Sequence, residues 1–329
     1  MSGPSRPAEF DIIARYFAPL AAQSEAALGL RDDAALVAVP AGHRQVVTTD
    51  MLVAGVHFLP DDPADLIARK MLRVNLSDVA AMGGAPVAVL LAIALSPACD
   101  EAWIARFAAG LAADLATYDI PLIGGDTTAT PGPLTLSVTA LGTVPERAEL
   151  RRSAAAPGDA VFVSGSLGDA ALGLLCLQGT LSPADPADRD ALVGRYRLPE
   201  PRVTLGPALR GLAHAAADVS DGLVADLGHI CETSGVGAEV AIDRIPLGPA
   251  ARRAVDADSG LIETVLTGGD DYELVFTAPP SAREAIAAAA AAVGVPVTEI
   301  GRIVGGGGVS VLDAAGRTVP LLRSGWQHR

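Results

Sequence analysis

Apolar segments of this sequence end in carboxylates again and again. The clearest case is residues 46–58, where a β-branched run reaches Thr48, Thr49 and Asp50, and His57 follows seven residues after Asp50. A buried carboxylate is costly unless it is solvated, paired or metal-bound, so one such acid is easily explained as a turn or a backbone cap. The pattern recurs, however, at Asp32, Asp33, Asp78, Asp126, Asp218, Asp221, Asp270 and Asp271. The repetition predicts a fold that gathers carboxylate oxygens into a site.

Two of these places predict strands that deliver oxygens at their ends. The run that stops at Thr48-Thr49-Asp50 is typical of a buried strand. A second strand, predicted over 121–124, leads into Gly124-Gly125-Asp126-Thr127, where the glycines let a backbone approach a ligand closely.

Asp78 belongs to a helix predicted from Ala64 to Met82. It continues the apolar stripe of that helix, so its carboxylate should face the buried side. Lys70 and Arg73 on the same helix offer an ion pair. The alternative is a metal ion shared with Asp50.

The second half of the chain holds three further candidates. Ser220 or Asp221 is predicted to cap the following helix, which leaves Asp218 to point elsewhere. Arg152 either grips a phosphate bidentately or lies in solvent. The turn at 164–168 carries a weaker signal for a phosphate cradle made of backbone amides.

Composition narrows the possible functions. The 329 residues are long enough for two α/β domains, predicted as 1–150 and 151–329, and a net charge of −14 argues against a nucleic-acid surface. Lys70 is the only lysine, and no Gly-Lys-Ser/Thr sequence exists, which excludes a P-loop. A carboxylate-rich site instead suits several Mg²⁺ ions that hold a polyphosphate. Three widely spaced cysteines suggest the cytoplasm, and the apolar run 87–95 is too short to cross a membrane.

Taken together and in order, six motifs resemble the thiamine-monophosphate kinase family, within the superfamily of aminoimidazole ribonucleotide synthetase and selenophosphate synthetase. The motifs occupy residues 32–35, 48–58, 74–83, 124–128, 218–223 and 268–274, so the resemblance covers nearly the whole chain. Two positions depart from the family pattern. Arg31 replaces a glycine, and Asp270 replaces a longer glutamate.

The resemblance implies an ATP-dependent phosphorylation of thiamine monophosphate to thiamine diphosphate by direct, Mg²⁺-assisted transfer, with no protein nucleophile or base. The implied Mg²⁺ ligands are Asp33, Thr48, Thr49, Asp50, Asp78, Asp126, Asp218 and Asp221. The implied ATP contacts are Gly125, Asp126, Arg152 and Ser220. The implied contacts to thiamine monophosphate are His57, Asp270 and Trp326.

The resemblance also implies a two-domain α/β fold. The N-terminal domain, which would bind ATP and Mg²⁺, would pair its sheet with that of a second subunit in a barrel-like homodimer. Two other functions remain open on the residues alone. One is a sister enzyme of the superfamily with another small acceptor, and the other is a non-catalytic nucleotide or metal sensor.

Overall fold

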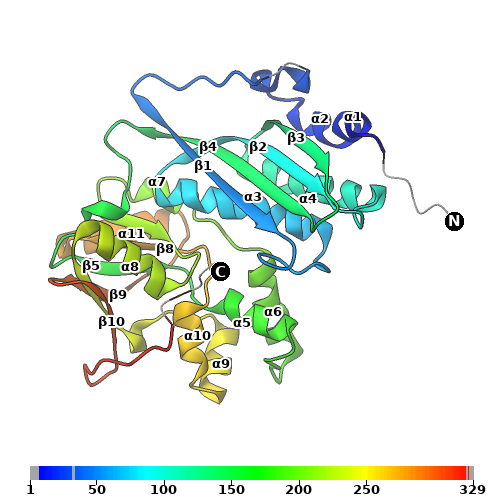
Figure 1. Cartoon of the computed structure of the whole chain (residues 1–329). Coiled ribbons are helices and arrows are strands. Elements are labelled where there is room, and N and C mark those ends of the chain that lie inside the picture. Colours follow the sequence, from blue (N-terminus) through cyan, green and yellow to red (C-terminus); the bar gives the residue numbers. More distant parts are fainter. Residues whose placement is uncertain (1–6, 32–33, 324, 326–329) are drawn as a thin grey trace. The chain divides into compact units, whose positions relative to one another are not determined.

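Two separate sheets organise the chain (Figure 1). The computed structural model describes residues 7–31, 34–323 and 325. The described residues divide into two units, one within 1–79 and 85–146 and the other within 80–84 and 147–329. Both units mix helices with strands, as the sequence predicts. Among the described residues, no helix combines the length and apolar character needed to span a membrane.

The first unit is built on a four-stranded sheet in the order β1-β4-β2-β3. β4 pairs antiparallel with both β1 and β2, whereas β2 and β3 are parallel. In the view of Figure 1, α3 and α4 lie behind this sheet. The elements are α1 (Glu9–Ile12), a π-helix (Ile13–Phe17), α2 (Ala18–Ala21), a 3₁₀ segment (Glu25–Leu30), β1 (His43–Val53), α3 (Ala64–Ala81), β2 (Ala85–Leu95), α4 (Glu101–Tyr118), β3 (Leu122–Ala129) and β4 (Thr135–Pro145).

The helices of this unit follow the apolar periodicity of the sequence. α3 matches the predicted helix within one residue at its end, and the apolar stripe of Ile67, Met71 and Val74 is buried. α4 begins after Asp100, whose carboxylate accepts a hydrogen bond from the backbone N–H of Trp103.

The two predicted strand ends are wrong. β1 continues to Val53, so Thr48, Thr49 and Asp50 lie in the middle of the strand, paired with Ala140, Thr139 and Val138 of β4. β3 likewise runs through both glycines to Ala129, so Asp126 is a strand residue that pairs with Ala92. Polar residues can occupy these positions because side chains on at least one face of each strand are exposed or contact residues of other elements.

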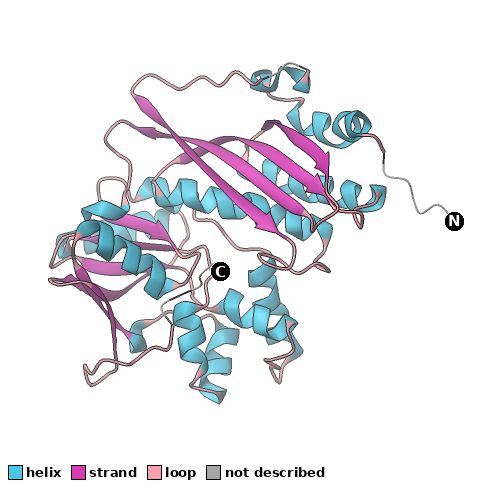
Figure 2. Cartoon of the chain, viewed as in Figure 1, coloured by secondary structure: helices cyan, strands magenta, loops and turns pink. Residues whose placement is uncertain are grey.

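The second unit contains a six-stranded sheet in the order β10-β7-β9-β5-β8-β6. β10 and β7 are parallel, and the other pairs are antiparallel. Side chains alternate along β5, so Val161 and Val163 enter one buried cluster while Ala160 and Phe162 enter another on the opposite face. Helices therefore cover both faces, as Figure 2 shows.

The elements of this unit are short and closely connected. They are a 3₁₀ turn (Arg152–Ala154), β5 (Ala160–Ser164), α5 (Asp169–Leu177), α6 (Pro186–Arg197), α7 (Leu205–Ala208), β6 (Ala215–Asp218), α8 (Leu223–Ser234), β7 (Gly237–Ala241), a 3₁₀ turn (Ile242–Arg244), α9 (Pro249–Ala257), α10 (Leu261–Thr267), β8 (Leu274–Ala278), a 3₁₀ turn (Pro280–Ala282), α11 (Arg283–Ala292), β9 (Val297–Val304) and β10 (Gly308–Leu312).

Candidate functional site

A pair of carboxylates lies between β1 and α3. Thr48 Oγ1 donates a 2.6 Å hydrogen bond to Asp78 Oδ2, and the backbone N–H of Asp50 donates to Asn75 Oδ1 at 2.9 Å. Asn75 is fully buried and donates in turn to the carbonyl of Met71, one turn earlier on α3. Burial, and then the charge of Asp78, raise the pKa of Asp50 from 3.8 to about 6.

A bound divalent cation would relieve the repulsion between these two carboxylates. Two carboxylates that repel each other in a partly dry site are stabilised by an ion between them, and carboxylate and hydroxyl oxygens are the hard donors that Mg²⁺ prefers. Arg73, one of the two cations that the sequence offered to Asp78, donates to Asp114 of α4 at 2.6 and 3.0 Å.

Thr49 and Asp126 lie on the other face of the same sheet. Thr49 Oγ1 donates to the carbonyl of Val138 at 3.0 Å and lies 3.3 Å from the hydroxyls of Ser137 and Thr139. Asp126 is exposed on the same face, because it pairs with Ala92, which pairs in turn with Ser137. Since side chains alternate along a strand, the five predicted ligands of the sheet and α3 form two groups in one chain.

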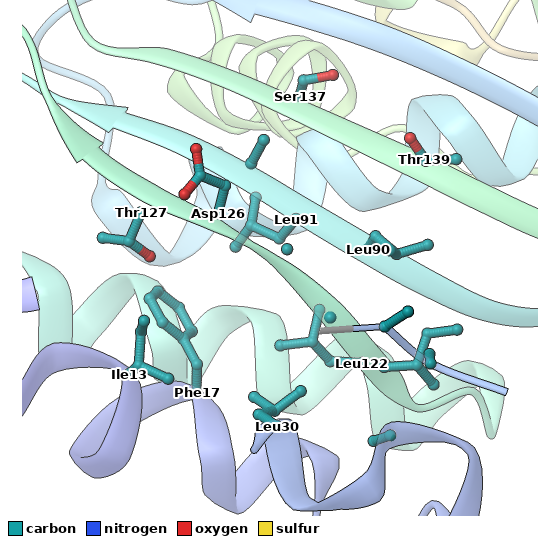
Figure 3. A pocket seen from close by; sticks show the side chains of 17 residues that line it. Ile13, Phe17, Leu30, Leu90, Leu91, Leu122, Asp126, Thr127, Ser137 and Thr139 are labelled. Atoms are coloured by element: carbon teal, nitrogen blue, oxygen red, sulfur yellow. The ribbon is translucent and has the colours of Figure 1, made fainter. Parts of the chain in front are cut away.

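A pocket of about 410 Å³ opens beside Asp126. Figure 3 shows the apolar side chains of Ile13, Phe17 and Leu30 on one side and the oxygens of Asp126, Ser137 and Thr139 on the other. The glycines of β3 line it as well. A Cβ on Gly125 would lie 1.8 Å from the carbonyl oxygen of Leu91, so only glycine allows this close strand contact.

His57 lies in the tight turn that follows β1. The backbone N–H of Val53 donates to His57 Nδ1 at 3.0 Å, while the amides of Val56 and His57 both donate to the carbonyl of Val53. Because Nδ1 accepts, the neutral ring carries its proton on Nε2. The ring is half-buried, and Phe58 beside it is fully buried.

In the second unit, the loops after β6 and before β8 are joined by backbone hydrogen bonds. Val219 N–H donates to the carbonyl of Glu273 at 2.8 Å, Tyr272 N–H to Val219 at 2.9 Å, and Asp270 N–H to Ser220 at 2.9 Å. Asp218 is buried at the end of β6, and Asp270 and Tyr272 both have a positive φ. The ladder brings the predicted ATP contact Ser220 against the predicted substrate contact Asp270.

The predicted helix cap at Ser220 or Asp221 is wrong. α8 begins after Gly222, which has no side chain to cap the helix. Asp226, in the first turn of α8, reaches back toward the preceding loop instead. Its Oδ2 accepts the backbone N–H groups of Ser220 and Asp221, both at 3.0 Å. Burial raises the pKa of Asp226 to about 7, although the backbone hydrogen bond from Asp221 and the charge of Arg152 act to lower it.

The turn at 164–168 does not present its amides to a phosphate. The N–H of Gly165 donates to the carbonyl of Pro296, that of Leu167 to Pro246, and that of Gly168 to Oδ2 of the buried Asp271. The weak signal for a phosphate cradle is therefore explained by protein partners.

Glu273 ties the same region together. It is fully buried, and its carboxylate accepts from Ser164 Oγ at 2.6 Å, from Arg195 at 3.0 Å and from Arg202 Nε at 2.6 Å. The buried contacts of Glu273 and Asp271 therefore account for two of the acidic residues in the motif at 268–274.

Two predicted site residues, Asp33 and Trp326, lie outside the described residues. Gly325, next to Trp326, packs against Ala225 and the carbonyl oxygen of Asp221. Sequence reasoning missed Asn75 and Asp226. Asn75 precedes Asp78 by three residues on one helix face, a spacing that could have suggested a shared role.

Comparison with protein families places both halves of the chain in one group. The model of the AIR synthase related protein, N-terminal domain, matches residues 31–144, and that of the C-terminal domain matches residues 156–314. A thiamine-monophosphate kinase of Caulobacter vibrioides is 47% identical over 325 residues, which cover 98% of this chain and 91% of the relative. The thiamine-monophosphate kinase of Escherichia coli is 47% identical over 90% of each chain.

Solved structures agree. The crystal structure of thiamine-monophosphate kinase from Stenotrophomonas maltophilia has a TM-score of 0.84 and 45% identity, covering 97% of this chain and 100% of that chain. AaThiL, complexed with AMPPCP and TMP, has a TM-score of 0.78 and 32% identity over 89% of each chain. The hydrogenase maturation protein HypE, in complex with ATP, shares the fold with a TM-score of 0.77 at 21% identity.

Proposed function

This chain belongs to the thiamine-monophosphate kinase family of AIR synthase related proteins, and we propose that it transfers the γ-phosphoryl group of ATP to thiamine monophosphate. The products are thiamine diphosphate and ADP. Two of the comparisons support this reaction most directly. They are the 47% identity to a thiamine-monophosphate kinase over nearly the whole chain, and the likeness to AaThiL, which was solved with AMPPCP and TMP.

The observation in this chain that carries the proposal is the carboxylate pair of Asp50 and Asp78. The raised pKa of Asp50 and the hydroxyl of Thr48 beside Asp78 suit a divalent cation. Asp33, Asp218 and Asp221 are further ligands that the family resemblance implies, and Thr49 and Asp126, on the opposite face of the first sheet, would form a second group of ligands. Bound Mg²⁺ would neutralise the phosphates and hold them in line.

The pocket beside Asp126 is a suitable place for the adenosine part of ATP. Its apolar wall would accept the base, and Gly125 and Asp126 on its rim would lie toward the phosphates. Arg152 would bind a phosphate through its guanidinium group, and Ser220 would add a hydroxyl.

Thiamine monophosphate would be held by His57, Asp270 and Trp326. The Nε2–H of His57 is a donor suited to a phosphate oxygen, because Nδ1 is engaged by the backbone. Asp270 is half-buried beside Ser220.

The chemistry needs no nucleophile or general base from the protein. A phosphate monoester has a second pKa of about 6, so the acceptor oxygen is already ionised at neutral pH. That oxygen forms the new bond to the γ-phosphorus as the bond to the β,γ-bridging oxygen of ATP breaks, and ADP leaves with the electron pair. The side chains named above therefore act by binding and orienting two anions.

We further propose that the protein is a cytoplasmic homodimer that pairs its N-terminal sheets. Val47 and Met51 of β1 are 59% and 60% exposed, on the sheet face that carries Thr49. Such apolar side chains on a strand are typical of a surface that is covered in an assembly.

The test is a coupled assay of ADP release with ATP, Mg²⁺ and a panel of phosphorylated acceptors. Turnover with thiamine monophosphate that requires Mg²⁺ is the expected result. Turnover with another acceptor alone would indicate a sister enzyme of the superfamily. Binding of ATP without any ADP release by the folded protein would indicate a nucleotide sensor.

A further inference from the structure

We propose that Asp226 is a positioning residue that fixes the Ser220–Asp221 backbone, so that the carboxylates of the 218–221 loop are held ready for a divalent cation. The inference rests on the proposed function, because it concerns the same loop. Asp226 itself is assigned no contact with ATP, the substrate or the metal.

The geometry is specific. Asp226 is 1% exposed, and one of its oxygens, Oδ2, accepts two successive backbone N–H groups at 3.0 Å each. The carbonyl of Ser220, which points the other way, accepts from the N–H of Asp270 at 2.9 Å. The peptide between Ser220 and Asp221 is thus held from both sides.

The loop before α8 turns sharply at Gly222, where the backbone is closely packed. Gly222, which precedes α8, has a φ of 115°, and a Cβ there would lie 2.8 Å from the backbone of Thr267. The loop therefore makes a sharp turn at a residue that contributes no side chain. A carboxylate that reaches back from the first turn of α8 supplies the acceptor that a capping side chain would otherwise provide.

Asp226 also lies close to charged neighbours. The ligand atoms of Asp221, Asp226 and His229 all lie within 4.8 Å of one another, and Arg152 offsets part of the negative charge. Positioning and direct metal ligation therefore make different predictions. An amide in place of the carboxylate keeps an acceptor for the two N–H groups, but it is a poor substitute for an anionic ligand.

The experiment uses three variants of the full-length protein. Asp226→Ala removes the acceptor, Asp226→Asn keeps it, and Cys231→Ala is a matched control that removes another buried side chain from α8 without touching the loop. Hydrogen exchange of the amides of residues 220 and 221 reports on the two bonds. The affinity for Mn²⁺ in the presence of AMPPCP, measured by electron paramagnetic resonance, reports on the metal site without turnover.

We expect Asp226→Ala to speed exchange at both amides and to weaken Mn²⁺ binding roughly 10- to 100-fold, the usual range for groups that orient metal ligands. Asp226→Asn should stay within about fivefold of the parent protein. Cys231→Ala should lower the melting temperature without changing the Mn²⁺ affinity.

Two results would overturn the inference. One is unchanged Mn²⁺ affinity in a folded Asp226→Ala protein. The other is an Asp226→Asn protein as impaired as Asp226→Ala, which would make Asp226 a ligand. Neither depends on the identity of the phosphoryl acceptor. Failure of the proposed function would appear separately, as a parent protein that binds Mn²⁺ and AMPPCP but does not phosphorylate thiamine monophosphate.

Discussion

Replacing Asp50 with asparagine is expected to stabilise the metal-free protein and to weaken its response to Mg²⁺. Burial and the charge of Asp78 raise the pKa of Asp50 from 3.8 to about 6. The folded protein therefore holds this proton more tightly than the unfolded chain does. The free energy of unfolding therefore falls as the pH rises from about 3.8 to about 6, and the whole of this loss is present above pH 6.

The pKa difference corresponds to about 3 kcal/mol at neutral pH. Water reaches part of the Asp50 side chain, so the expected gain for Asp50→Asn is smaller, about 1 to 2 kcal/mol. For a protein of this size, that gain raises the melting temperature by about 1 to 3 °C. The asparagine also lacks the charge that Mg²⁺ needs, so added Mg²⁺ should stabilise the variant less than the parent protein.

The assay is thermal unfolding at pH 7.5, first in EDTA and then across a Mg²⁺ titration. Asp61→Asn is the control, because it removes an exposed carboxylate from the same unit. An Asp50→Asn protein that melts at or below the parent protein in EDTA would contradict the expected gain. A variant that gains as much from Mg²⁺ as the parent does would remove Asp50 from the metal site.

Three other substitutions test separate parts of the structure. Asn75→Ala leaves the N–H of Asp50 without its acceptor and should cost about 1 to 3 kcal/mol in urea unfolding; an unchanged midpoint would remove Asn75 from the support of the carboxylate pair. Gly125→Ala places a Cβ against the carbonyl of Leu91, so stability should fall by about 1 to 3 kcal/mol and calorimetry should detect weaker ATP binding; normal ATP affinity would exclude this strand from the nucleotide site. Glu273→Gln removes the buried anion between Arg195 and Arg202 and should cost about 3 kcal/mol in the same urea assay, against which a neutral result would argue.

The helices and the fold class could be predicted because their signals are local. The apolar stripe of α3 specifies both its helical period and the side from which Asp78 reaches β1. The family resemblance likewise rests on short motifs, and the comparisons confirm it.

The strand ends could not be predicted, because the partners that allow polar residues inside strands come from distant segments. Thr48 and Asp50 remain within β1 since Asp78 and Asn75 of α3 meet them there. Asp126 remains within β3 since the strand is exposed on that face. Polarity alone does not mark the end of a strand.

The division of the ligands between two faces follows from strand alternation, but only once the strand is known to continue. Thr49 then necessarily faces away from Thr48 and Asp50. The partner of Arg73 is similarly long-range, because Asp114 lies 41 residues later on another helix. The role of Asp226 depends on a turn at Gly222 whose shape no local pattern specifies.

The central claim is a direct transfer from ATP to the phosphate of thiamine monophosphate, without a phosphorylated protein intermediate. A single-turnover reaction with γ-³²P-labelled ATP, excess enzyme and Mg²⁺ tests it most directly. The label is expected to appear in the terminal phosphate of thiamine diphosphate, none should stay on the protein, and EDTA should abolish the transfer. Label trapped on the protein, or released as inorganic phosphate while thiamine monophosphate remains unchanged, would contradict this claim.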